Sequence, residues 1–123
     1  FKKMTRKMNV QKVTIKTAQI YNYDEKSELI PTIKKYSRYK NVNGNWQLKK
    51  KLRNRCLRIW QSAVITTDGE LLPCCFDKNA SFSYGNLKEK SVTALWNSDK
   101  AIAFRKQVLS DRKNIDICQN CSE

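Results

Sequence analysis

The chain has 123 residues, 40% of them hydrophobic and 29% charged, which fits one ordinary domain or two very small ones and excludes a compositionally disordered protein. No run of about 18 apolar residues is present, and the charged start Phe1-Lys2-Lys3 is unlike a signal peptide, so we expect no membrane span and a cytoplasmic protein. Because the first residue is not Met, we also expect a piece of a longer protein.

The formal net charge of +14 is concentrated in the first half of the chain. Residues 1–55 carry 16 basic and 3 acidic residues, whereas residues 56–123 carry 9 and 8. Dense Lys and Arg beside aromatic residues would suit a nucleic acid. No histidine and no RNA-binding motif supports that partner, so the sequence disfavours it. The alternative is a basic face that a missing part of the protein covers.

The first half of the chain has one predicted element. Val10–Tyr21 alternates apolar and polar residues, which predicts a strand. A lone strand is marginally stable, so it must pair with a later hairpin or with a sheet that this chain lacks. Residues 22–55 are polar and basic, with Pro31 and Asn43-Gly44 as turn signals, and we interpret them as a connector with little core.

The second half predicts a hairpin followed by two helices. Residues 63–67 and 70–72 are apolar stretches on either side of Asp68-Gly69, which favours a tight type I′ turn. Ser91 can cap a helix over 92–96, and Ser98 can cap another from Asp99 to about Leu109. The second helix has an apolar stripe that predicts a core-facing side, formed by Ala101, Ile102, Phe104, Val108 and Leu109.

Five cysteines carry the strongest chemical signal: Cys56, Cys74, Cys75, Cys118 and Cys121. The last two form a C-x-x-C pair, which lets two thiolates converge on one metal, and a hairpin end can present another. Disulfides are disfavoured because the number is odd and no secretory segment is present. Four thiolates without histidine suit either zinc or an iron–sulfur cluster, and ligand type alone does not separate the two.

Six motifs in order resemble the SPASM/twitch domain, the auxiliary-cluster module of many radical S-adenosylmethionine (SAM) enzymes. They are Cys56-x-Arg58-x-Trp60, the hairpin over 65–77, Gly85-Asn86-Leu87, the stretch 91–98, Phe104-Arg105 and the final C-x-x-C. The resemblance implies an α+β fold in which a β-hairpin and then short helices surround a four-cysteine site over residues 56–123. Residues 1–55 would then be a remnant of the last strand of the enzyme's barrel plus a basic linker.

The resemblance also implies the ligands. The shorter, twitch form binds one [4Fe–4S] cluster, here through Cys56, Cys74, Cys118 and Cys121, whereas the full form needs more cysteines than this chain has. A shift of one residue would put Cys75 in place of Cys74. Arg58 and Arg105 are predicted to hydrogen-bond to the cluster or balance its charge, with surface or packing roles as the alternative.

Four further residues receive structural expectations. We expect Trp60 and Trp96 to lie in the core. Gly85 is predicted in a positive-φ turn that Asn86 closes, and Asp77 is expected to accept backbone hydrogen bonds near the end of the hairpin.

The C-x-x-x-C-x-x-C motif of radical SAM catalysis is absent from the chain. We therefore expect SAM and a second cluster only in a missing N-terminal barrel, which would be this segment's partner, and no catalysis by the segment alone. The parent enzyme would be an oxidoreductase or a peptide- or protein-modifying enzyme, acting on an unknown peptide, protein or small molecule. The alternative is a Cys₄ zinc-stabilised binding module with a basic nucleic-acid-binding arm, and a fragment purified in air could hold zinc in either case.

Overall fold

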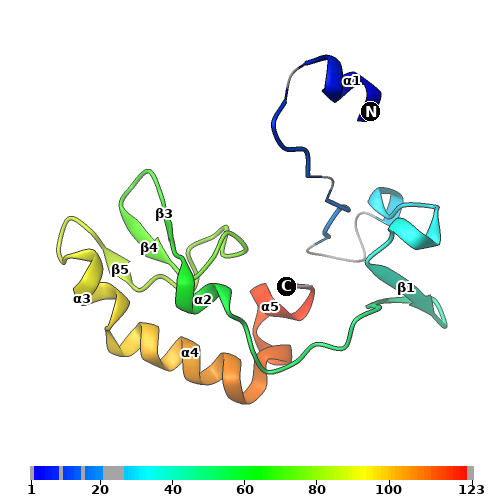
Figure 1. Ribbon diagram of the computed structural model, residues 1–123. Coiled ribbons are helices and arrows are strands. Elements are labelled where there is room, and N and C mark those ends of the chain that lie inside the picture. The colour runs from blue at the N-terminus through cyan, green and yellow to red at the C-terminus, as the bar shows by residue number, and fades with distance from the viewer. Residues whose placement is uncertain (1, 9, 15, 21–26, 122–123) are drawn as a thin grey trace.

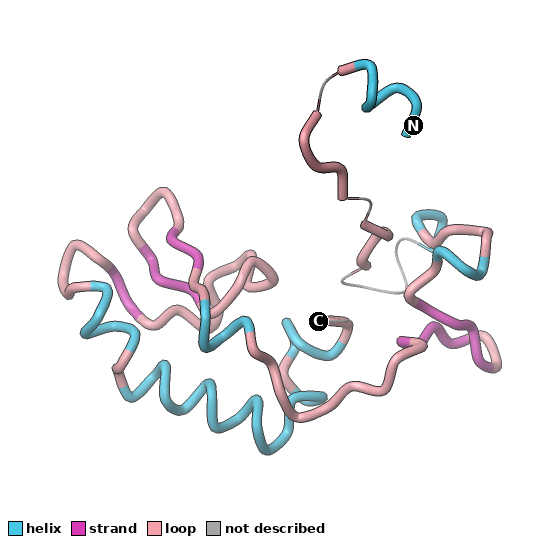
Figure 2. Tube along the Cα trace, in the orientation of Figure 1, coloured by secondary structure: helices cyan, strands magenta, loops and turns pink. Residues whose placement is uncertain are grey.

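The computed structural model describes residues 2–8, 10–14, 16–20 and 27–121. These residues form short helices and two small antiparallel sheets, which agrees with the expected mixture of helix and strand (Figures 1 and 2). The C-terminal half forms the larger body in Figure 1, and a smaller body around strand β1 precedes it in the sequence. None of the helices in the described residues is long and apolar enough to cross a bilayer.

A three-stranded sheet lies in the C-terminal body. Its strands β3 (Val64–Ile65), β4 (Glu70–Leu72) and β5 (Gly85–Asn86) are antiparallel and lie in that order. Strands β3 and β4 pair across Asp68-Gly69, where the sequence predicts a hairpin. The helix α2 (Arg58–Gln61) precedes the sheet, and α3 (Val92–Trp96), α4 (Asp99–Asp111) and α5 (Asp116–Gln119) follow it.

The turn between β3 and β4 differs from the predicted type I′ turn. Gly69 has a φ of 92°, but Asp68 does not share its positive φ. The Gly69 amide donates to the Thr66 carbonyl at 3.0 Å, and the Thr66 amide donates to the Glu70 carbonyl at 3.0 Å. The loop is therefore one residue longer than predicted, and glycine takes its single left-handed position.

Gly85 has the positive φ that was predicted, at 134°, but it lies in β5 opposite Leu71 and not in a turn. A Cβ atom at this position would lie 2.8 Å from Cδ2 of Leu95, so glycine is required for close packing as well as for backbone conformation. The Asn86 side chain closes the loop by accepting from the Lys88 amide at 2.9 Å and donating to the Asp68 carbonyl at 3.0 Å.

Both predicted helix caps are confirmed. The Ser91 hydroxyl accepts from the Ala94 amide, and the Ser98 hydroxyl accepts from the Ala101 amide, each at 3.3 Å. Helix α4 is slightly longer than predicted and buries only part of the expected stripe. Ala101, Phe104 and Val108 are buried, whereas Ile102 and Leu109 are 41% and 51% exposed because they flank the face that meets the sheet.

The main core lies between α4 and the sheet and extends to α5. Its buried members are Ile59, Leu71, Tyr84, Leu95, Ala101, Phe104, Val108, Ile115 and Cys118. Trp96 packs against this core as predicted. The prediction for Trp60 is wrong, since its side chain is 49% exposed and covers Arg105 from outside.

The first half of the chain differs most from the prediction. The described residues between 10 and 20 do not form the predicted strand, and they pair with neither of the two described sheets. Ile15 and Tyr21, which belong to the same prediction, lie outside the described residues. Helix α1 (Lys2–Lys7) precedes them, and two single-turn 3₁₀ helices follow at Ser27–Leu29 and Lys34–Tyr36.

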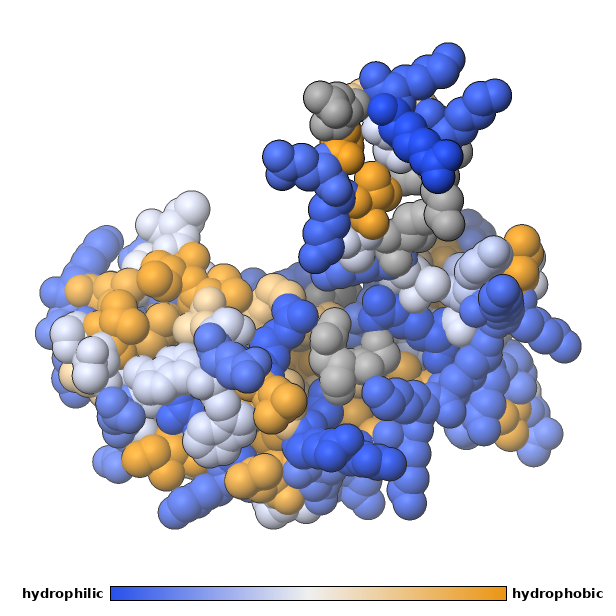
Figure 3. Space-filling model, in the orientation of Figure 1, coloured by the Kyte–Doolittle hydropathy of each residue, from blue (hydrophilic) through white to orange (hydrophobic). Residues whose placement is uncertain are grey.

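The predicted connector contains a hairpin. Strands β1 (Tyr39–Val42) and β2 (Asn45–Leu48) pair across Asn43-Gly44, whose φ values of 51° and 84° are those of a type I′ turn. Tyr39 packs with Ile20 and Ile30 in a small second core, and its hydroxyl accepts from the Ile20 amide at 2.8 Å. This part of the chain therefore has a folded core of its own, although hydrophilic side chains dominate its visible surface in Figure 3.

Candidate metal centre

The five cysteines come from three separate parts of the C-terminal body. Cys56 lies just before α2, Cys74 and Cys75 directly follow β4, Cys118 is in α5, and Cys121 lies two residues after that helix. Cys118 and Cys121 are buried, Cys56 and Cys74 are partly buried, and Cys75 is exposed. The fold therefore gives the adjacent Cys74 and Cys75 different environments.

Electrostatic interaction, shared packing and a shared cavity relate the four predicted ligands to one another. Cys74 interacts electrostatically with Cys121, and Cys118 interacts with both of them. Cys56 packs against the core cluster that contains Cys118, and it lines the same cavity as Cys121. Within the part of the chain that the structure describes, no three ligand-type side chains are grouped closely enough to hold one metal ion.

Burial makes the proton hard to remove from two of these thiols. Burial raises the pKa of Cys118 to about 11, while the adjacent Arg112 guanidinium lowers it and Cys74 and Cys121 raise it further. Burial likewise raises the pKa of Cys74, against backbone hydrogen bonds from Phe76 and Asp77 that lower it. A buried thiolate is unfavourable without a cation nearby, and a metal that replaces the proton removes that cost.

Asp77 shapes the loop that carries Cys74, as predicted. Its buried carboxylate accepts from the Ser81 amide at 2.8 Å and from the Phe82 amide at 2.9 Å. The Asp77 amide donates to the Cys74 carbonyl at 3.2 Å. Asp77 thus binds Cys74 through its backbone amide and residues 81 and 82 through its carboxylate, which orders the loop that follows β4.

Arg112, which is not among the site residues predicted from the sequence, joins the segment before Cys56 to the segment that carries Cys118. Its side chain is buried at 2% exposure, and Nη1 donates to the Arg55 carbonyl at 2.6 Å. The guanidinium also hydrogen-bonds to the thiol of Cys118. In the sequence Arg112 lies in the polar run Asp111–Asn114, which resembles a solvated helix end, so no local signal marks it.

Asn54 reinforces this connection. Its side-chain oxygen accepts from the Arg112 amide at 3.2 Å, and its side-chain nitrogen donates to the Ser110 carbonyl at the end of α4. The side chains of Asn54 and Arg112 therefore hold residues 53–55 against the end of α4. The first candidate ligand, Cys56, directly follows this segment.

The two arginines predicted beside the cluster have other described contacts, and their predicted role toward the cluster stays a prediction. Arg58 Nη1 makes a long contact of 4.0 Å to the sulfur of the exposed Cys75. Arg105 is buried with its guanidinium carbon 4.3 Å from the centre of the Trp96 ring and 5.8 Å from that of Tyr84. It also donates to the Trp96 carbonyl at 2.8 Å. These contacts give Arg105 a packing role through cation–π interaction.

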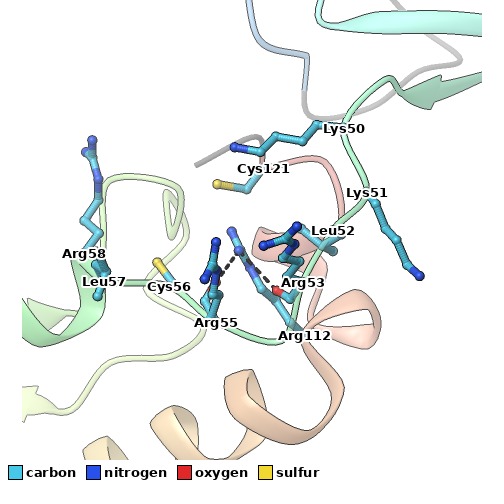
Figure 4. A pocket seen from close by; sticks show the side chains of 10 residues that line it. All are labelled: Lys50, Lys51, Leu52, Arg53, Arg55, Cys56, Leu57, Arg58, Arg112 and Cys121. Carbon is cyan, nitrogen blue, oxygen red and sulfur yellow. Dashed lines mark hydrogen bonds between the residues drawn. The ribbon is translucent and has the colours of Figure 1, made fainter.

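A cavity of about 390 Å³ opens between Cys56 and Cys121 (Figure 4). Its other lining residues are Lys50, Lys51, Leu52, Arg53, Arg55, Leu57, Arg58 and Arg112. In Figure 4 the sulfurs of Cys56 and Cys121 face this space from opposite sides. Six of the ten lining residues are basic, and none is acidic.

The N-terminal residues reach the C-x-x-C pair. The Gln19 side chain donates to the Asn120 carbonyl, between the two cysteines, at 3.0 Å. Arg38 in turn donates to the Gln19 side chain at 2.9 Å and to the Thr17 hydroxyl at 2.7 Å. The smaller body thus contacts the backbone of the candidate metal centre.

Comparison with known proteins places this geometry in context. A sequence model of SPASM, an iron–sulfur cluster-binding domain, matches residues 56–122. A curated relative from Niallia circulans, S-adenosyl-L-methionine-dependent 2-deoxy-scyllo-inosamine dehydrogenase, is 38% identical over 61 residues, which are 49% of this chain and 24% of the relative. The crystal structure of BtrN in an open conformation, solved with selenomethionine, matches with a TM-score of 0.50 and 35% identity over 55% of this chain and 32% of that one. The chain therefore spans about a quarter to a third of these proteins.

Proposed function

The chain belongs to the SPASM family of iron–sulfur cluster-binding domains, and from this membership we propose that it holds one auxiliary [4Fe–4S] cluster in a radical SAM enzyme. The proposed ligands are Cys56, Cys74, Cys118 and Cys121. Cys75 is proposed to remain outside the ligand set, because it is exposed and its described contact is with Arg58.

The observation that carries the proposal is the set of four thiol donors in the matched domain: Cys56 and Cys121 line one cavity, and Cys74 and Cys118 each interact electrostatically with Cys121. Four thiolate donors without histidine suit either an iron–sulfur cluster or zinc, and the match to an iron–sulfur cluster-binding domain favours the cluster. Such a cluster takes each thiolate on a different iron, so its four ligands can come from separate parts of the chain, as Cys56, Cys74 and the C-x-x-C pair do. The raised pKa values of Cys74 and Cys118 add support, because iron in place of the protons would relieve the cost of burying these thiolates.

Four protein thiolates leave no iron site open for substrate, so the proposed role is auxiliary. When bound, the cluster supplies one-electron chemistry whose potential depends on burial, charge and hydrogen bonds. The chain's own residues hold the cluster, exclude water from it and shape the wall of a substrate pocket. Because the curated relative is named as a SAM-dependent dehydrogenase, we propose an oxidoreductase as the parent enzyme.

Single cysteine variants of the full-length protein, purified without oxygen, test the ligand set. We expect Cys118→Ala and Cys74→Ala to lose most bound iron and sulfide, since each removes one thiolate from a buried site. Cys75→Ala is the matched control and is expected to retain both. Absorbance near 400 nm, iron content and acid-labile sulfide content are the measurements.

The control also decides between the two adjacent cysteines. If Cys75→Ala loses the cluster and Cys74→Ala retains it, Cys75 is the ligand in place of Cys74. Full iron and sulfide in Cys118→Ala would contradict the proposed site as a whole.

A further inference from the structure

A side chain from the first half of the chain holds the C-x-x-C loop. The matched SPASM region begins at residue 56, yet Gln19 Nε2 donates to the carbonyl of Asn120, 101 positions later, at 3.0 Å. Asn120 lies inside the turn that the Cys121 amide closes by donating to the Cys118 carbonyl at 3.0 Å. The Gln19 contact therefore acts on the backbone that sets the position of the second sulfur of the pair.

Arg38 determines which way the Gln19 amide points. Arg38 Nη1 donates to Oε1 of Gln19 at 2.9 Å, and Arg38 Nε donates to the Thr17 hydroxyl at 2.7 Å. A guanidinium can only donate hydrogen bonds, so it requires the oxygen of the Gln19 amide on its own side. The amide nitrogen is then turned toward Asn120, and Arg38 positions Gln19 for its contact with the loop.

Tyr39 brings the smaller body close to the same sulfur. Its side chain is 2% exposed, and its hydroxyl accepts from the amide of Ile20, the residue after Gln19, at 2.8 Å. Burial raises the pKa of the Tyr39 hydroxyl, the Ile20 backbone and Arg38 lower it, and the Cys121 thiol raises it further. The hydroxyl and the Cys121 sulfur therefore lie within electrostatic range of each other.

The segment that carries Gln19 has little apolar packing before this point. From residue 10 to residue 18 the described side chains are exposed, except for the partly buried Thr17. Gln19 is partly buried and Ile20 is buried, so the segment meets the rest of the protein where the polar contacts lie. Hydrogen bonds with fixed donors and acceptors make this a directed contact with the loop, which apolar packing alone would not give.

We propose that Gln19, positioned by Arg38, clamps the C-x-x-C loop and thereby keeps Cys121 bound to the auxiliary cluster. The inference rests on the proposed function, because it adds residues outside the matched domain to the same site. Gln19 acts through the backbone of the ligand loop and is a positioning residue. Hydrogen bonds around a metal site orient its ligands and slow their release, so the clamp retards loss of iron.

Release of iron to a strong ferrous chelator, followed without oxygen on the cluster-loaded full-length protein, tests the clamp. We expect Gln19→Ala to release iron about fivefold faster, since the lost hydrogen bond no longer opposes opening of the loop. Gln19→Glu keeps an acceptor for Arg38 but has no hydrogen to donate to Asn120, so it is expected to release iron at least as fast.

The matched control is Gln47→Ala, which removes the same side chain from an exposed position in β2 of the same body. It is expected to release iron as the wild type does. Urea unfolding of each sample separates a local effect from general loosening. Faster release that only follows a loss in the free energy of unfolding, in the control as well as in the Gln19 variants, would overturn the clamp.

A double-mutant cycle tests whether Arg38 acts through Gln19. The variant Arg38→Ala/Gln19→Ala should release iron no faster than Gln19→Ala, because the clamp is already absent in the single variant. Effects of the two substitutions that multiply would contradict the positioning of Gln19 by Arg38.

Iron and sulfide are measured before each release experiment, so two failures can be told apart. Gln19 variants that hold the cluster and release iron at the wild-type rate overturn the clamp and leave the proposed function intact. A wild-type protein without a cluster overturns the proposed function and this inference with it.

Discussion

At the scale of single residues, Arg112 is the main addition of the structure to the predicted site. A buried guanidinium that contacts one candidate ligand and the backbone beside another can act both by position and by charge. The two arginines predicted for this task have other described contacts, Arg58 with Cys75 and Arg105 with aromatic rings. Arg112 is therefore the residue for which an electrostatic effect on the cluster is expected.

Replacing Arg112 separates these two effects. A nearby positive charge favours the reduced, more negative form of the cluster, so Arg112→Gln should lower its midpoint potential by on the order of 100 mV. Arg112→Lys keeps the charge and should recover part of the shift. A redox titration followed by electron paramagnetic resonance measures the potential.

Lys113→Gln is the control, because it removes one positive charge from the neighbouring, exposed position. Its potential should equal that of the wild type. If Arg112→Gln binds less cluster but the remaining cluster keeps the wild-type potential, Arg112 acts by position alone and the electrostatic account is wrong.

At the scale of elements, the packing of β5 against α3 depends on Gly85. Ala at this position would combine an unfavourable backbone conformation with a Cβ atom 2.8 Å from Leu95, and we expect a loss of about 3 kcal/mol in the free energy of unfolding. Gly44→Ala is the matched comparison, since Gly44 also has a positive φ but open space around it, and about 1 kcal/mol is expected there.

Urea unfolding followed by circular dichroism measures both losses. A loss in Gly85→Ala no larger than that in Gly44→Ala would mean that α3 can move aside, and that the close packing of β5 contributes little.

The elements also explain which predictions succeeded. Ser91 and Ser98 cap their helices as predicted because a cap depends on residues three positions apart. Asn43-Gly44 carries an equally local hairpin signal, but the surrounding basic residues led to its interpretation as a connector. Arg112 and Trp60 could not be predicted in this way, because their burial and exposure depend on contacts with residues about 50 positions away.

At the scale of the whole molecule, the two bodies of the chain meet at the candidate metal centre. The C-terminal body supplies all five cysteines, and the N-terminal residues reach the backbone between Cys118 and Cys121 through Gln19. The basic residues 49–55 join the two bodies and carry most of the cavity's positive charge. The site therefore depends on contacts between distant parts of the chain, and a bound cluster is expected to stabilise these contacts.

The central claim is that four cysteines of this chain hold one [4Fe–4S] cluster. The most direct test is the content of iron, acid-labile sulfide and zinc in the 123-residue chain, purified and reconstituted without oxygen. We predict about four irons and four sulfides per chain, with little zinc. Stoichiometric zinc without sulfide would contradict the claim and would favour a zinc-stabilised module in its place.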